Sequence, residues 1–144
     1  MRIGFDARLI RETGIGSYIS NLLQEIKKID KINNYFIFLN SKALPDFTLP
    51  NKRWNKIALD VSWHSIKEQL IVPFILKKYS LDLVHFPYFN VPVLYRGKYI
   101  ITVHDLIIDH FATGRASTLP WIAHKTKKLF YHFVMGKALE RAAE

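Results

Sequence analysis

Apolar residues recur along this chain in two patterns that alternate from the N-terminus onward. One pattern is a short continuous apolar run, typical of a strand that is buried on both faces of a sheet. The other is a spacing of three and four residues with polar residues between, typical of a helix that buries one side. The expected strands are Ile3–Phe5, Tyr35–Leu39, Lys56–Val61, Leu81–Phe86 and Tyr99–Val103, and the expected helices are Gly14–Ile29, Ser65–Tyr79 and Thr118–Ala143.

Two prolines bear on these helices. Pro73 falls inside the second one and is expected to start a new turn there or to kink it, because proline cannot donate a helical hydrogen bond. Pro120 falls in the first turn of the third helix, where proline is well tolerated. The polar segment from Asn40 to about Trp54 also contains prolines and predicts a loop.

Alternation of apolar strands with helices predicts an α/β fold, namely a Rossmann-like, doubly wound and mostly parallel sheet. The 144 residues are expected to form one domain, spanning 1–144. In such a sheet, ligands bind outside the carboxyl ends of the strands, at the point where the strand order reverses. The loops after Phe5, Phe86 and Val103 are therefore the expected site.

The composition and the N-terminal residues bear on the compartment in which the protein works. The chain has no cysteine, which excludes disulfides and thiolate metal or redox sites and fits a reducing cytoplasm. The N-terminus reaches Asp6 at once and does not resemble a signal peptide. No run approaches the roughly 20 apolar residues of a membrane span. A cytoplasmic location is expected.

The chain is basic, with 21 Lys and Arg against 12 Asp and Glu, a formal net charge of +9. Such an excess favours anionic partners, although a lysine-rich solvated surface would give the same count. No nucleic-acid partner is expected, because no reading motif is present and the aromatic residues recur at core positions rather than forming a stacking platform.

The first loop, DARLIRETGIGSY, places Gly14 and Gly16 where a helix begins. It lacks the third glycine of a dinucleotide fingerprint and is too long for that motif's tight turn, which disfavours a nicotinamide dehydrogenase. Two interpretations remain. The helix start binds an anion through its backbone N–H groups, or the glycines serve only a turn and close helix packing.

The last of these loops begins with His104 and Asp105, directly after an apolar strand. Three roles remain for the histidine: general acid or base, a hydrogen bond to substrate, or a hydrogen bond to local backbone. A metal is not expected, because Asp105, Asp109 and His110 show no paired-ligand spacing. No Gly-x-Ser-x-Gly elbow supplies a hydrolase nucleophile.

Three stretches, MRIGFDARLIRETGIGSYISNLL, LVHFPYFNVP and YIITVHDLIIDHF, together resemble the N-terminal half of a bacterial family 4 retaining glycosyltransferase of the GT-B fold. The resemblance covers essentially the whole chain. It implies the acceptor-binding half of an enzyme that transfers a sugar from a nucleotide-sugar donor to a glycan or lipid-linked acceptor. The nucleotide-sugar is a substrate, and no cofactor is expected.

The resemblance also implies roles for individual residues. The loop Gly14-Ile15-Gly16 would approach the donor diphosphate, and His104 would lie near the transferred sugar, with Asp105 orienting the loop or the imidazole. The residues expected to line the acceptor side of the cleft are Asp6, Arg8, Tyr88 and Asn90.

The end of the chain departs from the family pattern. The final residues resemble the helix before the last strand of the N-terminal domain, so a domain cut before that strand is expected, without its donor-binding partner domain. Such a half is expected to be inactive alone, since preorganised charge around the leaving group is usually the largest catalytic term. The alternative is a non-catalytic module that binds carbohydrate or nucleotide. An open sheet edge would also allow a homodimer.

The expected last helix is basic on one side. Its cationic residues and histidines are His124, Lys125, Lys127, Lys128, His132, Lys137 and Arg141. Glycosyltransferases of this fold often dock on anionic membranes through such a face of this domain, which implies a peripheral membrane contact. An ordinary amphipathic helix with solvated lysines explains the same pattern.

Overall fold

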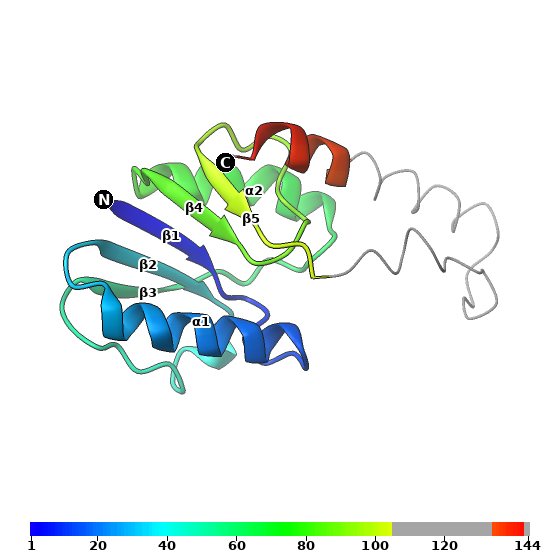
Figure 1. Ribbon diagram of the computed structural model, residues 1–144. Coiled ribbons are helices and arrows are strands. Elements are labelled where there is room, and N and C mark those ends of the chain that lie inside the picture. The colour runs from blue at the N-terminus through cyan, green and yellow to red at the C-terminus, as the bar shows by residue number, and fades with distance from the viewer. Residues whose placement is uncertain (105–133, 143–144) are drawn as a thin grey trace.

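The computed structural model describes residues 1–104 and 134–142 (Figure 1). The described elements are β1 (Arg2–Asp6), α1 (Ile15–Ile29), β2 (Asn34–Leu39), the 3-10 turn η1 (Ser41–Ala43), β3 (Trp54–Ala58), α2 (Ile66–Lys78), β4 (Leu83–Phe86) and β5 (Tyr99–Ile101). Residues 134–141 form a further helix.

The five strands form one parallel sheet in the order β3-β2-β1-β4-β5. Helix α1 covers one face of this sheet, and α2 together with the 134–141 helix covers the other (Figure 1). This confirms the predicted α/β, Rossmann-like, doubly wound fold. The strand order reverses between β1 and β4, which places the switch point at the centre of the sheet.

Neighbouring residues of β2 explain why its apolar run is uninterrupted. Ile37 packs in the layer beneath α1 with Ile19 and Leu23, whereas Phe38 packs in the layer beneath α2. Because successive side chains point to opposite faces, a strand covered on both sides must be apolar at every position.

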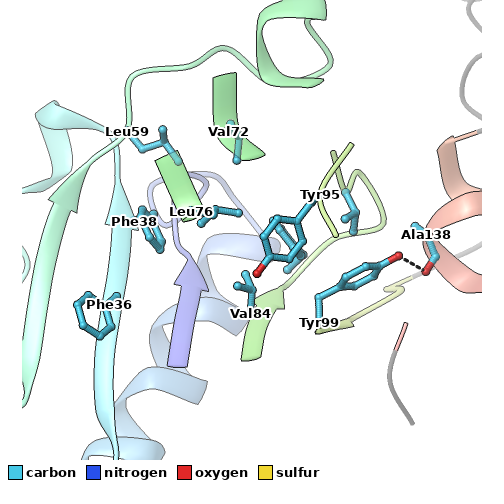
Figure 2. Close-up of a cluster of buried hydrophobic side chains, with 11 residues drawn as sticks. Phe36, Phe38, Leu59, Val72, Leu76, Val84, Tyr95, Tyr99 and Ala138 are labelled. Carbon is cyan, nitrogen blue, oxygen red and sulfur yellow. Dashed lines mark hydrogen bonds between the residues drawn. The ribbon is translucent and has the colours of Figure 1, made fainter. Parts of the chain in front are cut away.

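The layer beneath α2 also joins the 134–141 helix to the sheet. In Figure 2, Leu76 of α2 and Val84 of β4 lie in one cluster with Tyr99 of β5. The Tyr99 hydroxyl donates a hydrogen bond of 2.9 Å to the carbonyl of Ala138. This contact fixes the helix over β5.

Three strands differ by two residues or more from their expected bounds. β4 begins at Leu83 rather than Leu81, and β5 ends at Ile101 rather than Val103. β3 begins at Trp54 rather than Lys56 and ends at Ala58, because Trp54 pairs with Tyr35 and stacks on its ring at 4.3 Å. α2 runs through Pro73 as one continuous helix. Pro73 has no N–H for the helical ladder and its ring crowds the preceding turn, but the buried Val72 and Leu76 hold the helix against the sheet on both sides of it.

Most of the expected helix Thr118–Ala143 lies outside the described residues. Of its basic residues, Lys137 pairs with Glu140 at 2.7 Å, and Arg141 donates to the carbonyls of Val93 and Tyr95. Within residues 1–104 and 134–142, no helix is long and apolar enough to cross a bilayer. The membrane contact and the homodimer stay predictions; β3 and β5 form the two edges of the described sheet.

Candidate functional site

The residues predicted from sequence gather at the carboxyl edge of the sheet, on both sides of the switch point. Asp6 is the last residue of β1 and Arg8 follows it, Tyr88 and Asn90 follow β4, and His104 follows β5. Since β1, β4 and β5 are neighbours in the sheet, their following loops are adjacent.

Arg8 is the centre of a buried group of charges behind this edge. Its side chain is 2% exposed and forms two parallel bonds with the Asp6 carboxylate, at 2.9 Å from Nε and 2.6 Å from Nη2. Nη2 also donates to Glu68 Oε1 at 2.6 Å, and Nη1 donates to the Val61 carbonyl at 3.0 Å. The guanidinium therefore ties β1 to α2 and to the segment before it.

Glu68 joins the remaining loops to Arg8. Its Oε2 accepts hydrogen bonds from the backbone N–H of His64, at 2.9 Å, and from the side-chain amide of Asn90. Burial raises the pKa of Glu68 above its usual value, although the neighbouring Arg8 opposes this. Burial alone would lower the pKa of Arg8, but Asp6 and Glu68 outweigh it and raise that pKa. Arg8 is consequently a permanent cation.

These contacts define what three of the predicted acceptor residues do in the fold. Asp6, Arg8 and Asn90 are all buried, and their charged or amide groups bond within this cluster. Their side chains hold the loops that carry the edge. Contact with an acceptor stays a prediction for them.

Tyr88 belongs to a group of rings beside the charged cluster. Its ring lies 5.3 Å from that of Trp63 and 4.1 Å from that of Phe89, centroid to centroid. The Arg8 guanidinium lies 5.5 Å from the Trp63 ring centre, a cation–π contact that joins the two groups. The ring group joins the segment before α2 to the loop after β4.

His104 is exposed at the same edge. Its Nε2 lies 2.9 Å from the Pro87 carbonyl, which can only accept, so Nε2 carries the hydrogen. In the neutral ring, Nδ1 is then the atom with a lone pair. This bond to local backbone was one of the three roles considered from sequence, and it leaves one ring nitrogen for a ligand.

Tyr18 connects His104 to the first turn of α1. Its ring meets the His104 ring edge to face, with centroids 4.8 Å apart. Its hydroxyl lies 3.0 Å from Thr102 Oγ1, which in turn lies 2.9 Å from His85 Nε2. The start of α1 and the histidine after β5 are thereby held side by side.

The backbone of the glycine loop is partly occupied. The N–H groups of Ile15 and Gly16 donate to the carbonyls of Thr13 and Glu12, and that of Tyr18 donates to Gly14. Among the described residues, the Ser17 N–H has no backbone acceptor at this helix start. Gly14 has φ of 71°, which disfavours any side chain, and a Cβ there would meet open space.

Gly16 is required by packing. A Cβ at this position would lie 2.5 Å from the carbonyl oxygen of Ile10, an atom of the backbone that cannot turn aside. The turn-and-packing interpretation therefore accounts for both glycines. Anion binding by the same loop stays a prediction.

We expect Gly16→Ala to lower the free energy of unfolding by about 1–3 kcal/mol, because the added methyl overpacks against the Ile10 carbonyl. Urea unfolding of the variant and of wild type measures the change. Ser17→Ala is the matched control, since Ser17 is exposed in the same helical turn and should change stability by less than about 0.5 kcal/mol. Equal stability of the two variants would contradict the packing requirement.

Two residues of the site were not singled out from sequence, although each left a signal. Glu68 stands four residues before Val72 and eight before Leu76, so it occupies the buried stripe of α2. His85 interrupts the apolar strand β4. A polar residue inside an apolar pattern indicates a buried polar partner, but the pattern alone does not reveal which one.

Asp105 lies outside the described residues. Within the ranges 1–104 and 134–142, no group of three or more His, Asp or Glu side chains is placed to hold a metal ion. Comparisons of the chain with protein-family models, with curated proteins and with solved structures gave no match.

Proposed function

We propose that this chain is the acceptor-side half of a retaining glycosyltransferase that uses a nucleotide-sugar donor. The observation that carries the proposal is the contact between Tyr18 and His104 at the switch point. It brings the positive end of α1, which favours a diphosphate, beside an exposed imidazole that has an acceptor nitrogen available.

In this proposal the residues of the chain position the donor and the acceptor. Nδ1 of His104 accepts a hydrogen bond from a hydroxyl of the transferred sugar, while the Pro87 carbonyl fixes the ring. Ser17 offers a backbone N–H to the diphosphate at the start of α1. The bond from the anomeric carbon to the diphosphate oxygen breaks, the acceptor hydroxyl oxygen bonds to the same carbon on the same face, and the departing diphosphate takes up the hydroxyl proton.

The proposed chemistry needs a second domain. Departure of the diphosphate is favoured by preorganised positive charge, and α1 contributes only the partial charge of a helix end. Arg8, the buried cation of this edge, is already neutralised by two carboxylates. A facing domain that binds the nucleotide would supply the remaining charge and exclude water.

A binding module without chemistry is the alternative. It is favoured by the glycine loop, where packing and backbone conformation account for both glycines, and by the internal bonding of Asp6, Arg8 and Asn90. Such a module would hold a carbohydrate or nucleotide against Tyr88 and Trp63.

The test is sugar transfer from UDP- and GDP-sugars, measured with the chain alone and with a separately produced donor-binding domain of the same fold. We expect turnover only in the mixture, and a loss of about tenfold to a hundredfold in His104→Ala, the range for a hydrogen bond of about 1.5–3 kcal/mol. Lys52→Gln is the control, since Lys52 is exposed and distant in sequence from every loop of the site.

Calorimetric titration of the same sugars separates the alternative. Tight binding by the chain alone, without turnover when the second domain is added, would favour the binding module. If His104→Ala transferred sugar as fast as wild type, His104 would have no role in transfer. The proposal that one domain binds the acceptor and the other the donor would be unaffected.

A further inference from the structure

A hollow of about 620 Å3 lies at the opposite edge of the sheet from the candidate site. Its lining includes Leu81, which comes just before β4, and Gly97, which comes just before β5. The amino ends of parallel strands share one edge, so the hollow is remote from the loops that follow the strands. Its volume is within the range of roughly 300–1,000 Å3 that is usual for small-molecule sites.

The wall of the hollow is mainly apolar and aromatic. Phe74 of α2 and Leu94 of the facing segment line it and are 70% and 48% exposed. Pro73 adds its ring from the helix side, and Tyr95 is buried at the base with its ring packed against Phe86. Two large apolar side chains are therefore left facing water across a concave surface, where a hydrocarbon chain would cover them.

The segment that forms the outer wall is held in place. Arg141 donates to the carbonyls of Val93 and Tyr95 at 3.1 and 3.2 Å, and the Val93 N–H donates to Gln69 Oε1 at 2.8 Å. Three hydrogen bonds from other elements therefore hold the segment that forms this wall. A ligand would find its wall already formed.

The charged residues of the lining are Lys77 and Arg96, both cations. Both are exposed, and in the part of the chain that the structure describes neither side chain forms an ion pair. Among the described residues, no acidic side chain lines the hollow. The chemistry complementary to this surface is an apolar chain that ends in an anionic group.

We propose that the hollow binds a single-chain anionic amphiphile, with its hydrocarbon chain against Phe74 and Leu94 and its head group between Lys77 and Arg96. A nucleotide-sugar fits this wall poorly, because it would leave many hydroxyl groups against apolar side chains. The hollow is separate from the proposed transfer site and has different residues, so variants of one site do not test the other.

The test is calorimetric titration of the 144-residue chain with monododecyl phosphate below its micelle concentration. We expect saturable binding of one molecule per chain, weakened at least tenfold in Lys77→Gln/Arg96→Gln and in Phe74→Ala. Lys52→Gln/Lys67→Gln removes the same charge outside the lining, and Ile66→Ala removes an exposed apolar side chain from the same helix. Both controls should bind as wild type does.

Three results would overturn the proposal. Equal weakening in the lining and control variants would show attraction to net charge alone. Binding of inorganic phosphate as tight as that of the amphiphile would show an anion site without a role for the apolar wall. Binding to phosphatidylglycerol vesicles with none to the monomeric amphiphile would assign the surface to a membrane instead.

Discussion

Glu68→Ala is expected to lower the free energy of unfolding by about 3–5 kcal/mol, the usual cost of breaking a buried ion pair by removing one partner. Glu68 is completely buried and accepts hydrogen bonds from Arg8, the His64 backbone and Asn90. Without its carboxylate, the Arg8 cation keeps Asp6 as its ion-pair partner, and the His64 backbone N–H and the buried Asn90 amide lose their acceptor. Urea unfolding at pH 7 measures the loss.

Two further variants make this result specific. Glu68→Gln keeps an oxygen for Arg8 but presents an amide to two donors, so we expect a smaller loss of about 1–3 kcal/mol. Glu25→Gln removes a carboxylate that pairs with Lys28 on the exposed side of α1 and should cost less than about 1 kcal/mol. A Glu68→Ala protein as stable as Glu25→Gln would mean that the buried charges do not depend on one another.

A second large effect is expected from pH, through His85. This side chain is 8% exposed, and its ring packs edge to face on Phe5 at 4.7 Å. Burial, together with the nearby His104, lowers the pKa of His85 to about 4. Between pH 6.5 and 4 the unfolded chain therefore binds a proton that the folded chain does not, and stability falls as the pH is lowered through this window.

The size of the effect follows from the shift. We expect the His85 contribution to cost about 2.5 kcal/mol between pH 7.5 and pH 4.5, since one pKa unit corresponds to about 1.4 kcal/mol. At pH 7.5, His85→Gln should have a lower free energy of unfolding than wild type. Between pH 7.5 and pH 4.5 its free energy of unfolding should fall by about 2.5 kcal/mol less than that of wild type. Comparing the two proteins cancels the opposite contribution of Glu68, whose raised pKa favours folding at lower pH.

A direct measurement is available for the same group. Nuclear magnetic resonance titration should show the His85 ring neutral down to about pH 5, with Nε2 still bonded to Thr102. A ring that titrates at pH 6 or above would contradict the burial argument, because His85 would then be as well solvated in the fold as in the unfolded chain.

The sequence pattern predicted the layered fold well because each strand and helix is marked by its own local residues. The apolar run of β2 and the periodic residues of α1 are such marks, and both elements were found within one residue of their expected bounds. β3 was shifted because its burial pattern is irregular: Trp54 is buried, whereas Asn55 and Lys56 are exposed. Its position is set by pairing with Tyr35, a residue from a different element.

The sequence predicted where the site lies in the fold, but not which of its side chains bond to one another. Doubly wound topology alone puts the loops after β1, β4 and β5 together, and Asp6, Arg8, Asn90 and His104 are found there. The bond between Arg8 and Glu68 joins residues 60 positions apart, and neither local spacing nor composition carries that information. The same holds for Tyr18, whose helical spacing marks it only as a residue that packs.

The central position of β1 determines when the sheet can be completed during synthesis. β1 can pair with β2 as soon as residues 34–39 emerge, but its other side receives β4 only with residues 83–86. The Arg2 N–H bonds to Asp82 and its guanidinium to the Tyr79 carbonyl, so both of these contacts also wait for a partner about 80 residues later. Pairing over such separations is slow. When about the first 60 residues have emerged, β3, β2 and β1 can pair while the side of β1 that later receives β4 stays open, an unpaired edge that favours contact with other chains.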